Sequence, residues 1–409
     1  MKILIIGSGG REHALCWKLS QSPGVILYAA PGNPGMARVA TCIPSTDYNS
    51  VADSIQPDLT VVGPEGPLAA GIVDQFRAQG RAIVGPTAAA AQLESSKVFA
   101  KEFMRRAGIP TARFVVAETV EEAHHALRQF SLPVVLKADG LAAGKGVVVA
   151  STNEQAEQSI TQLLRPGSRL VIEEFLPGEE VSFIVLSDGH NVLPLEASQD
   201  HKAAYDGDSG PNTGGMGAYC DGRILTPAET QRVMDTIILP AIETMRAEGR
   251  LFTGFFYAGL MMTSDGPSVL EFNARLGDPE TQALLHRMRS DFAPALLDSG
   301  RNALSGHSLE WKPDPSVCVV MAAAGYPADV RSGDPITGVE HPGEAVVFQA
   351  GTRSEGEALL TSGGRVLGVT GSGPDLASAI ANTYGEVAKI RFAGMHFRTD
   401  IGRKGLKRW

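Results

Sequence analysis

The sequence predicts a multidomain protein that begins with an α/β unit and continues with α+β units. Short apolar runs at residues 2–6, 25–29 and 59–62 have strand character and alternate with helical segments, the first from about 11 to 20. This alternation is typical of a doubly wound parallel sheet. The length of 409 residues provides for roughly two to four packed units.

Breaks in the later sequence divide the rest of the chain. A predicted helix from about 95 to 107 ends at Gly108 and Pro110, and a Pro-Asp-Pro run lies at 313–315. The expected domains are 1–100, 101–305, with a smaller lobe at about 112–180 and a larger lobe at about 181–305, and 306–409. Further expected elements are helices at 119–129, 226–248 (interrupted near Pro240), 279–297 and 376–390, and strands at 316–323, 344–350 and 365–370.

Composition excludes several classes of protein. The net charge of −9 argues against nonspecific nucleic-acid binding, which uses a basic face. The four cysteines form no Cys-x-x-Cys pair, so we expect them to be reduced and mostly in the core of a cytoplasmic protein. No segment is long and apolar enough to span a membrane, and the apolar run at 3–6 is too short for a signal peptide. The basic run at 403–408 is expected to be a solvated tail.

One strand-like segment, Val269–Arg275, carries oxygen ligands. Alternate side chains of a strand share a face, so Glu271, Asn273 and Arg275 should point one way, and Leu270 and the other intervening apolar residues towards the core. Carboxylate and amide oxygens suit Mg²⁺, and a guanidinium suits a phosphate or carboxylate. A surface strand with a salt bridge is the alternative interpretation.

A second segment has the composition of a phosphate-binding loop. A short buried strand ends at Lys137, and a loop of small residues from Gly140 to Gly146 contains Gly144 and Lys145. Glycines let backbone N–H groups approach an anion, and both lysines would neutralise phosphate oxygens. The spacing is not that of a P-loop, and a strand follows instead of a helix. A hairpin with a flexible glycine tip is the alternative.

A third segment, residues 170–185, has two strand-like runs around a Pro-Gly turn. Main-chain groups of Phe175 and Leu176 would pair with an adenine edge. Glu173 would accept hydrogens from the adenine amino group, and Glu180 would bind ribose hydroxyls. The alternative is an acidic hairpin whose glutamates are solvated.

The first glycine-rich turn follows the first predicted strand and precedes a helix. Its run from Gly7 to Glu12 lacks the last glycine of a dinucleotide-binding motif, because Glu12 occupies that position. A helix N-terminus with adjacent glycines also binds a lone phosphate. Residues 31–33 and 63–65 lie at neighbouring strand ends, where parallel sheets bind ligands. For 31–33, a simple tight turn is the alternative.

Together with further motifs, these segments resemble the phosphoribosylamine–glycine ligase (glycinamide ribonucleotide synthetase) family of the ATP-grasp superfamily. The further motifs are Ile5–Leu15, Val62–Leu68, Gly85–Lys97, Ser198–Lys202 and Gly210–Tyr219. The resemblance extends from Met1 to about Gly402. It implies an N-terminal doubly wound sheet, a two-lobed ATP-grasp core with ATP between the lobes, and a small C-terminal α+β domain.

The resemblance also implies the nucleotide and metal sites. Glu271 and Asn273 match the family's ligands for Mg²⁺ or Mn²⁺, although the preceding strand, Phe255–Leu260, lacks the acid that many ATP-grasp enzymes place there. The implied catalytic residues are Arg275, Lys137 and Lys145. The residues implied to bind ATP are Lys97, Lys137, Gly140, Gly144, Lys145, Gly146, Glu173, Glu174, Phe175, Leu176 and Glu180.

The implied substrates are glycine and 5-phosphoribosylamine, whose phosphate would lie at the first glycine-rich turn. The residues implied to bind these substrates are Gly9, Gly10, Arg11, Glu12, Gly32, Asn33, Pro64, Glu65, Asp200, Lys202, Asp206, Thr213, Gly214, Gly215, Met216 and Arg275. No nucleic-acid or membrane partner is expected, and the protein is expected to be a monomer.

The implied activity is that of an ATP-dependent carbon–nitrogen ligase of purine biosynthesis. Glycine would be phosphorylated to glycyl phosphate and then transferred to the amine, giving glycinamide ribonucleotide, ADP and phosphate. Three alternatives stay open: an ATP-grasp enzyme acting on another carboxylate such as bicarbonate, a nucleotide-binding module without turnover, and an oxidoreductase that uses the first glycine turn.

Overall fold

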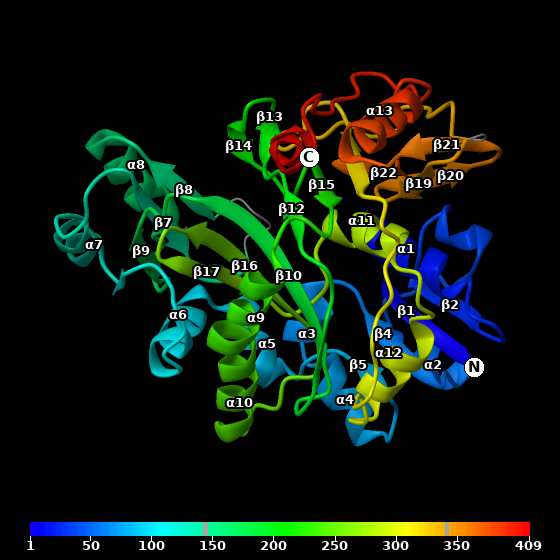
Figure 1. Ribbon diagram of the computed structural model, residues 1–409, viewed down its shortest axis with the longest axis horizontal. Coiled ribbons are helices and arrows are strands. Elements are labelled where there is room, and N and C mark those ends of the chain that lie inside the picture. The colour runs from blue at the N-terminus through cyan, green and yellow to red at the C-terminus, as the bar shows by residue number, and fades with distance from the viewer. Residues whose placement is uncertain (142–145, 340–342) are drawn as a thin grey trace.

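The structure is a computed structural model that describes residues 1–141, 146–339 and 343–409. Figure 1 shows a smaller lobe, with α7 (Val120–Leu127) and α8 (Asn153–Leu163), that projects from a larger body. In that body the N-terminal and C-terminal parts of the chain lie side by side. None of the helices in the described ranges is long and apolar enough to cross a membrane.

The N-terminal unit is a parallel sheet in the order β3-β2-β1-β4-β5. In β1 (Lys2–Gly7), Leu4 and Ile6 pack into one apolar cluster, and Ile3 and Ile5 into another. Burial on both faces is typical of a doubly wound sheet, so the predicted α/β class is confirmed. The other strands are β2 (Ile26–Pro31), β3 (Thr41–Cys42), β4 (Leu59–Val62) and β5 (Ile83–Val84). The helices are α1 (Gly10–Leu19), α2 (Tyr48–Ile55), α3 (Glu65–Ala69), α4 (Ile72–Ala78) and α5 (Ala88–Ser95), with a 3₁₀ turn at Met36–Arg38.

The smaller lobe is an antiparallel sheet in the order β6-β9-β7-β8, against which α7 and α8 pack. Its apolar side chains, among them Leu136, Ile160 and Ile172, form a cluster of their own. Each of the two helices begins after a threonine whose hydroxyl accepts a first-turn N–H, a favourable N-cap. The strands are β6 (Phe114–Ala117), β7 (Val134–Ala138), β8 (Val147–Ala150) and β9 (Leu170–Glu174), and α6 (Lys97–Arg106) precedes them.

The larger lobe and the C-terminal unit share one antiparallel sheet, in the order β17-β16-β10-β12-β15-β18-β22-β19. They meet where β15 (Gly217–Cys220) pairs with β18 (Ser316–Ala322). The other strands are β10 (Glu179–Ser187), β11 (Val192–Pro194), β12 (Ser198–Asp200), β16 (Gly254–Thr263), β17 (Gly266–Asn273), β19 (Val346–Gln349) and β22 (Arg365–Ser372). Separate hairpins are formed by β13 (Ala203–Tyr205) with β14 (Ser209–Asn212), and by β20 (Thr352–Glu355) with β21 (Ala358–Thr361).

Helices cover this shared sheet and end the chain. They are α9 (Pro227–Val233), α10 (Leu239–Ala247), α11 (Glu280–Arg287), α12 (Ala293–Gly300), α13 (Leu376–Val387) and the 3₁₀ helix η3 (Arg403–Arg408). The predicted architecture of an N-terminal sheet, a two-lobed core and a C-terminal α+β unit is confirmed. The domain limits at 100 and 305 stay predictions, because the sheet continues across the second.

The single helix predicted at 279–297 is wrong, because the structure has two helices there. The first ends where Met288 adopts an extended backbone, with φ −65° and ψ 120°. The second begins with Pro294 in its first turn, where the missing N–H is tolerated. The interruption expected near Pro240 is confirmed as a π-helical segment, Met234–Ile238, between α9 and α10.

The hairpin considered for residues 170–185 is also wrong. β9 belongs to the sheet of the smaller lobe and β10 to the shared sheet, so the chain between them connects the two lobes. Gly178 in this connector has φ 153°, and a Cβ there would lie 2.3 Å from the carbonyl oxygen of Met262. Glycine is therefore required where the connector passes over β16.

The packing of α1 joins the N-terminal unit to the C-terminal unit. The Gln349 N–H donates to Nδ1 of His13 at 2.7 Å, and the Gln349 carbonyl accepts from the Asn33 amide at 2.8 Å. Trp17 stacks on His286 of α11, with ring centroids 5.9 Å apart. Burial lowers the pKa of His13 and of His286 to about 4, so both rings are neutral at neutral pH.

Lowering the pH from 7 to 5 should lower the thermal midpoint of unfolding through these two histidines. In the unfolded chain they bind protons near pH 6.5, whereas in the folded chain they stay neutral down to about pH 4. The contribution of the two neutral histidines to the free energy of unfolding is therefore fully present above pH 6.5, and it falls at lower pH as the unfolded chain takes up protons. Each histidine accounts for roughly 2 kcal/mol of this loss at pH 5. Scanning calorimetry at several pH values measures the effect.

The variant His286→Phe is the matched control for this prediction. It keeps an aromatic ring against Trp17 and removes the group that titrates. Its midpoint should therefore fall less between pH 7 and pH 5 than that of the unmodified chain. Equal falls in the two proteins would contradict the role of His286.

Candidate active site

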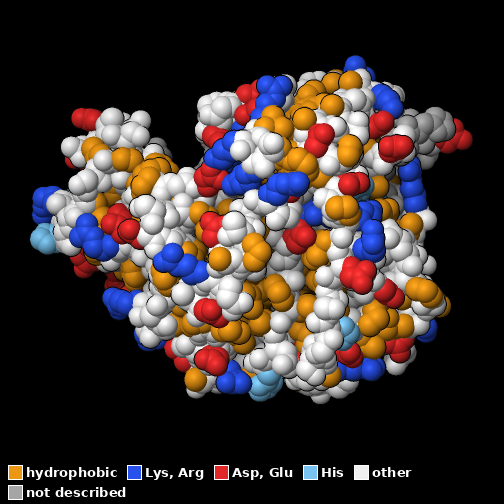
Figure 2. Space-filling model, viewed as in Figure 1, with side chains coloured by type: hydrophobic (Ala, Val, Ile, Leu, Met, Phe, Trp, Pro, Cys, Tyr) orange, Lys and Arg blue, Asp and Glu red, His pale blue; other side chains and the backbone are white. Residues whose placement is uncertain are grey.

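A large cavity of about 1280 Å³ lies where the three parts of the chain meet. Its wall includes the turn before α1, the connector between β9 and β10, residues of β17 and residues of the C-terminal unit. Figure 2 shows a hollow between the projecting lobe and the body, with Lys and Arg side chains gathered beside it. The cavity therefore brings together segments that are far apart in the sequence.

The predicted metal ligands enter the cavity from β17. Glu271 and Asn273 line it, and Arg275 follows them. Leu270 also lines it, against the expected alternation, because the pairing with β16 shifts at this residue and leaves it without a partner. Glu271 and Asn273 line the cavity as predicted, and Phe272 also lines it, against the expected alternation.

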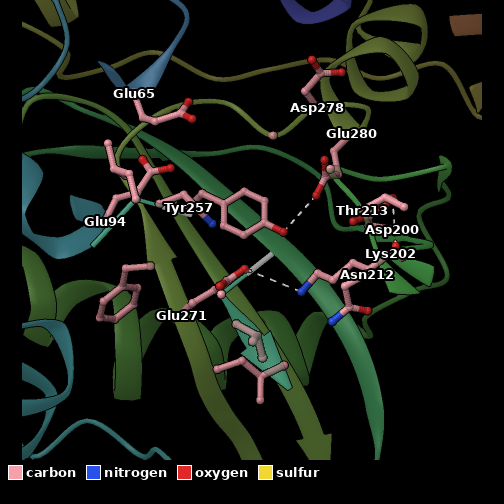
Figure 3. A pocket seen from close by; sticks show the side chains of 18 of the residues that line it. Glu65, Glu94, Asp200, Lys202, Asn212, Thr213, Tyr257, Glu271, Asp278 and Glu280 are labelled. Carbon is pink, nitrogen blue, oxygen red and sulfur yellow. Dashed lines mark hydrogen bonds and ion pairs between the residues drawn. The ribbon is translucent and has the colours of Figure 1, made fainter. Parts of the chain in front are cut away.

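Lysines surround the carboxylate of Glu271. Figure 3 shows Lys202 pointing towards it, and the ion-pair distance is 3.6 Å. Burial raises the pKa of Glu271, but the nearby Lys202, Lys137 and Lys97 lower it to about 2. The carboxylate is thus ionised at neutral pH and open to a divalent cation.

Arg275 is held by the N-terminal unit. Its Nη2 lies 2.7 Å from Glu94 of α5, and its Nε lies 3.4 Å from Glu65 of α3. A Glu94 oxygen also accepts the N–H of Ala274 at 2.7 Å. Arg275 in turn donates to Oδ1 of Asn273 at 3.2 Å. Glu94 therefore fixes both the guanidinium and the peptide next to a predicted metal ligand.

Glu173 is a shared anchor for two lysines. Its carboxylate forms ion pairs with Lys137 and with Lys101 of α6. Lys137 also donates to the Leu270 carbonyl at 2.9 Å, and Lys101 to the Thr111 hydroxyl at 2.7 Å. Burial raises the pKa of Glu173, but the two lysines hold it below its ordinary value. Burial lowers the pKa of Lys101 to about 8. Lys137 is therefore fixed in the cavity wall before any ligand binds.

Lys97 lies at the stem of the glycine loop. Its Nζ donates to the Gly140 carbonyl at 2.8 Å. The neighbouring Asp139 accepts from the Ser96 hydroxyl at 2.9 Å and from the Val98 N–H at 3.2 Å, so the stem is attached to the start of α6. Burial lowers the pKa of Lys97.

Acidic side chains gather at another part of the wall. Figure 3 shows Tyr257 pointing towards Glu280, with Asp200 and Lys202 beside them. The Tyr257 hydroxyl donates to Glu280 at 2.9 Å, and the Ser182 hydroxyl donates to the same oxygen at 3.0 Å. Burial and the neighbouring Glu280 raise the pKa of Asp200. Such a pair of carboxyl groups favours a cationic ligand group such as an ammonium.

The turn before α1 already contains a carboxylate. Glu12 accepts the Gly9 N–H at 2.6 Å and the Arg11 Nε at 2.5 Å. A Cβ at Gly63 would lie 2.0 Å from Glu12, so glycine there leaves room for this side chain. Arg11 also donates to the carbonyl of Leu276 at 3.2 Å, which links the turn to the end of the β17 segment.

Most of the predicted site residues line the cavity. They are Gly9, Arg11, Glu12, Pro64, Glu65, Lys97, Lys137, Gly140, Gly146, Glu173, Glu174, Phe175, Leu176, Glu180, Asp200, Lys202, Thr213, Gly214, Glu271, Asn273 and Arg275. Gly144 and Lys145 lie outside the described residues.

Six predicted substrate residues lie away from the cavity wall, namely Gly10, Gly32, Asn33, Asp206, Gly215 and Met216. Met216 is completely buried, and Asp206 accepts the N–H of Thr399 at 2.8 Å. The side-chain amide of Asn33 donates to the Gln349 carbonyl and so joins the N-terminal unit to the C-terminal unit. These groups therefore serve the packing around the cavity in the ligand-free chain.

Several lining residues were not singled out from the sequence, namely Glu94, Lys101, Tyr257, Asp278, Glu280, Arg365 and Lys404. The only feature of the sequence that could have indicated Glu280 as a site residue is its position shortly after the Glu-x-Asn segment. Arg365 lies 3.2 Å from Asp278 and donates to the Gly214 carbonyl at 2.6 Å. The solvated tail predicted at 403–408 is wrong, because η3 packs on the body and Lys404 lines the cavity.

Family models match almost the whole chain. The N domain of phosphoribosylglycinamide synthetase matches residues 1–94, its ATP-grasp (A) domain 95–281 and its C domain 316–404. A phosphoribosylamine–glycine ligase from Ralstonia nicotianae is 50% identical over 422 residues, covering 100% of both chains. One from Yersinia pestis is 50% identical over 426 residues with the same coverage.

Solved structures agree with this match. The phosphoribosylamine–glycine ligase of Thermotoga maritima has a TM-score of 0.86 and 35% identity, and the match covers 98% of this chain and 100% of that one. A biotin carboxylase from Campylobacter jejuni has a TM-score of 0.73 at 15% identity, covering 99% of this chain and 95% of that one, which shows a shared fold. The chain therefore belongs to the phosphoribosylamine–glycine ligase family of ATP-grasp proteins.

Proposed function

We propose that this protein ligates glycine to 5-phosphoribosylamine at the expense of ATP, in purine biosynthesis. The observation that supports this most is the meeting of Glu271, Asn273 and Arg275 with Lys97 and Lys137 in one cavity. A carboxylate does not acylate an amine at neutral pH, because its oxide is a poor leaving group. Phosphorylation of glycine to glycyl phosphate supplies a good leaving group, and the amine of phosphoribosylamine then displaces phosphate.

The donor set fits a hard divalent cation such as Mg²⁺ or Mn²⁺. Glu271 is ionised, and Asn273 offers an amide oxygen beside it on the same strand. These two residues would hold the metal, which supplies charge neutralisation at phosphate oxygens when bound. On the neighbouring strand β16, the residue opposite Asn273 is Tyr257 and not an acid. The Tyr257 hydroxyl donates to Glu280.

The chain's own cations would orient the reacting groups. Lys97 and Lys137 would bind ATP phosphates, and Arg275 would face the group in transfer. Glu94 and Glu65 hold Arg275 in place beforehand, so little reorganisation is needed when charge develops. Catalysis in this proposal is positioning and charge neutralisation, and it uses no protein nucleophile.

The connector between the lobes would receive the adenosine. Phe175 is 42% exposed and lines the cavity beside Leu176, so an adenine ring can cover both. Glu180 lies 3.0 Å from Lys202 and would accept ribose hydroxyls. Glu173 and Glu174 would act indirectly, since Glu173 binds lysines and Glu174 accepts the Arg113 N–H at 2.7 Å.

The acceptor would enter from the N-terminal unit. Arg11 and the turn around Gly9 would bind the phosphate of phosphoribosylamine, and Asp200 would bind an ammonium group. We further propose that the protein acts as a monomer in the cytoplasm and takes small-molecule substrates.

The first test is phosphate release with Mg-ATP, glycine and freshly generated phosphoribosylamine, with each omitted in turn. Release that needs all three, together with glycinamide ribonucleotide, is the expected result. Release without glycine would favour another carboxylate such as bicarbonate. ATP binding without phosphate release would favour a nucleotide-binding module. Binding of NAD(P)H would favour an oxidoreductase.

Glu271→Gln should lower kcat on the order of 10²-fold or more, because an amide binds the metal less well than a carboxylate. Raising the Mg²⁺ concentration should restore part of the activity. Glu357→Gln, at an exposed position between β20 and β21, is the matched control and should leave kcat unchanged. A Glu271→Gln enzyme with an unaltered metal requirement would count against the ligand role.

Glu94→Gln should lower kcat by roughly 10-fold to 100-fold, the range for groups that orient metal ligands. The amide can still accept the Ala274 N–H, but it no longer pairs with Arg275. The KM for ATP should change little, since the contacts of Glu94 are with Arg275 and the Ala274 peptide and not with the connector between the lobes. Steady-state kinetics separate the two parameters, and a rise in KM alone would refute a positioning role.

A further inference from the structure

Two cations in the cavity wall form no ion pair with a carboxylate of the described residues. Within the described residues, eight cationic side chains line the cavity, namely Arg11, Lys97, Lys101, Lys137, Lys202, Arg275, Arg365 and Lys404. All of them form ion pairs except Lys97 and Lys404. Lys97 is already matched to a nucleotide phosphate. Lys404, which comes from η3, has no place in the proposed function.

Nearby acids do not satisfy the Lys404 ammonium. Its Nζ donates to the Asp200 carbonyl at 2.9 Å, which leaves two N–H groups without a partner in the described chain. Glu180 is paired with Lys202, and Asp208 with Arg398 at 2.8 Å. Burial lowers the pKa of Lys404 even though Asp208, Asp200 and Glu180 oppose that shift.

The position of Lys404 is set by contacts on both sides of it. On one side, Arg398 pairs with Asp208 of the β13–β14 turn, and the Gly402 N–H donates to His201 at 3.3 Å. On the other side, Arg408 pairs with Glu179 at the start of β10. Figure 1 shows the end of the chain beside β13, β14 and β15.

A second contact beyond Lys404 supports this anchoring. The indole N–H of Trp409 donates to Asp221 at 2.7 Å, and the Arg223 guanidinium lies 3.4 Å from the Trp409 ring centroid. Gly405 packs against Tyr219, where a Cβ would lie 2.7 Å from the ring. The ammonium is therefore held at the wall by the protein itself.

Lys404 is partly buried, and it has no ion-pair partner among the described residues. Desolvation of such a cation is costly, and a bound anion offsets that cost. We infer that Lys404 is a substrate-binding residue whose ammonium binds a ligand oxyanion. This oxyanion is the carboxylate of glycine, the phosphate of phosphoribosylamine or a phosphate of ATP. The inference deepens the proposed function and rests on it for the identity of these ligands.

The test is calorimetric titration of the full chain with glycine, with ribose 5-phosphate as a stable stand-in for phosphoribosylamine, and with Mg-ATP. Lys404→Gln removes the charge and keeps an N–H for the Asp200 carbonyl. Binding of one of the three ligands should weaken roughly 10-fold or more, while the melting temperature of the ligand-free chain stays the same or rises because an unpaired charge is removed. Lys404→Arg should retain most of the affinity, and the ligand affected identifies the oxyanion.

Arg403→Gln is the matched control, since it removes a neighbouring exposed charge in the same helix. It should leave all three affinities within twofold. The inference is overturned if Lys404→Gln binds all three ligands as the unmodified chain does. It is also overturned if both Gln variants weaken binding equally, which would indicate a general charge effect.

If Lys404→Gln does not fold, Lys404→Ala takes its place, and Lys404→Arg is still expected to retain most of the affinity. A folded Ala variant that loses affinity for one ligand supports the inference, and one that binds all three ligands as the unmodified chain does overturns it. An unmodified chain that binds the ligands without forming product would refute the proposed ligase alone. One that binds none of them would refute both.

Discussion

The contact of Glu94 with Arg275 and with the Ala274 peptide is the constraint on which the site depends. It joins a helix of the N-terminal unit to the end of a strand built in another sheet. Together with the contact of Arg11 with the Leu276 carbonyl, it fixes Asn273 and Arg275 relative to the turn before α1. The side chain of Glu94 is only 8% exposed and that of Arg275 18%, so water competes little for this ion pair.

The cavity is assembled from compensated charges. Glu173 balances Lys101 and Lys137, and Glu271 lies within reach of Lys202. The ion pairs of Glu173 are buried, and buried pairs add little to stability because desolvation offsets their attraction. Their effect is geometric, since each partner restricts the other to one orientation. The ligand-free chain therefore presents oriented cations to a polyanionic ligand.

Local sequence signals account for much of the fold and for the strand that bears Glu271 and Asn273. Apolar runs bounded by Gly and Pro locate the N-terminal strands to within one or two residues, because these signals are local. The bulge at Leu270 escaped prediction, since it depends on pairing with β16. The break at Met288 and the ordering of residues 403–408 escaped it for the same reason. Contacts with more distant residues accompany both, namely the bridge of Met288 to Trp311 and the pairing of Arg408 with Glu179.

The sheet that runs without interruption from β17 to β19 has a consequence for how the chain can be divided. A fragment that stops before β18 would leave β15 as an open edge with unpaired N–H and C=O groups, a template for strand addition by another molecule. Such a fragment would also lose the partners of Asn33 and His13 on Gln349. The C-terminal unit is thus a structural complement of the core, and gene-level splitting or fusion is better tolerated at the projecting lobe, whose apolar cluster is separate.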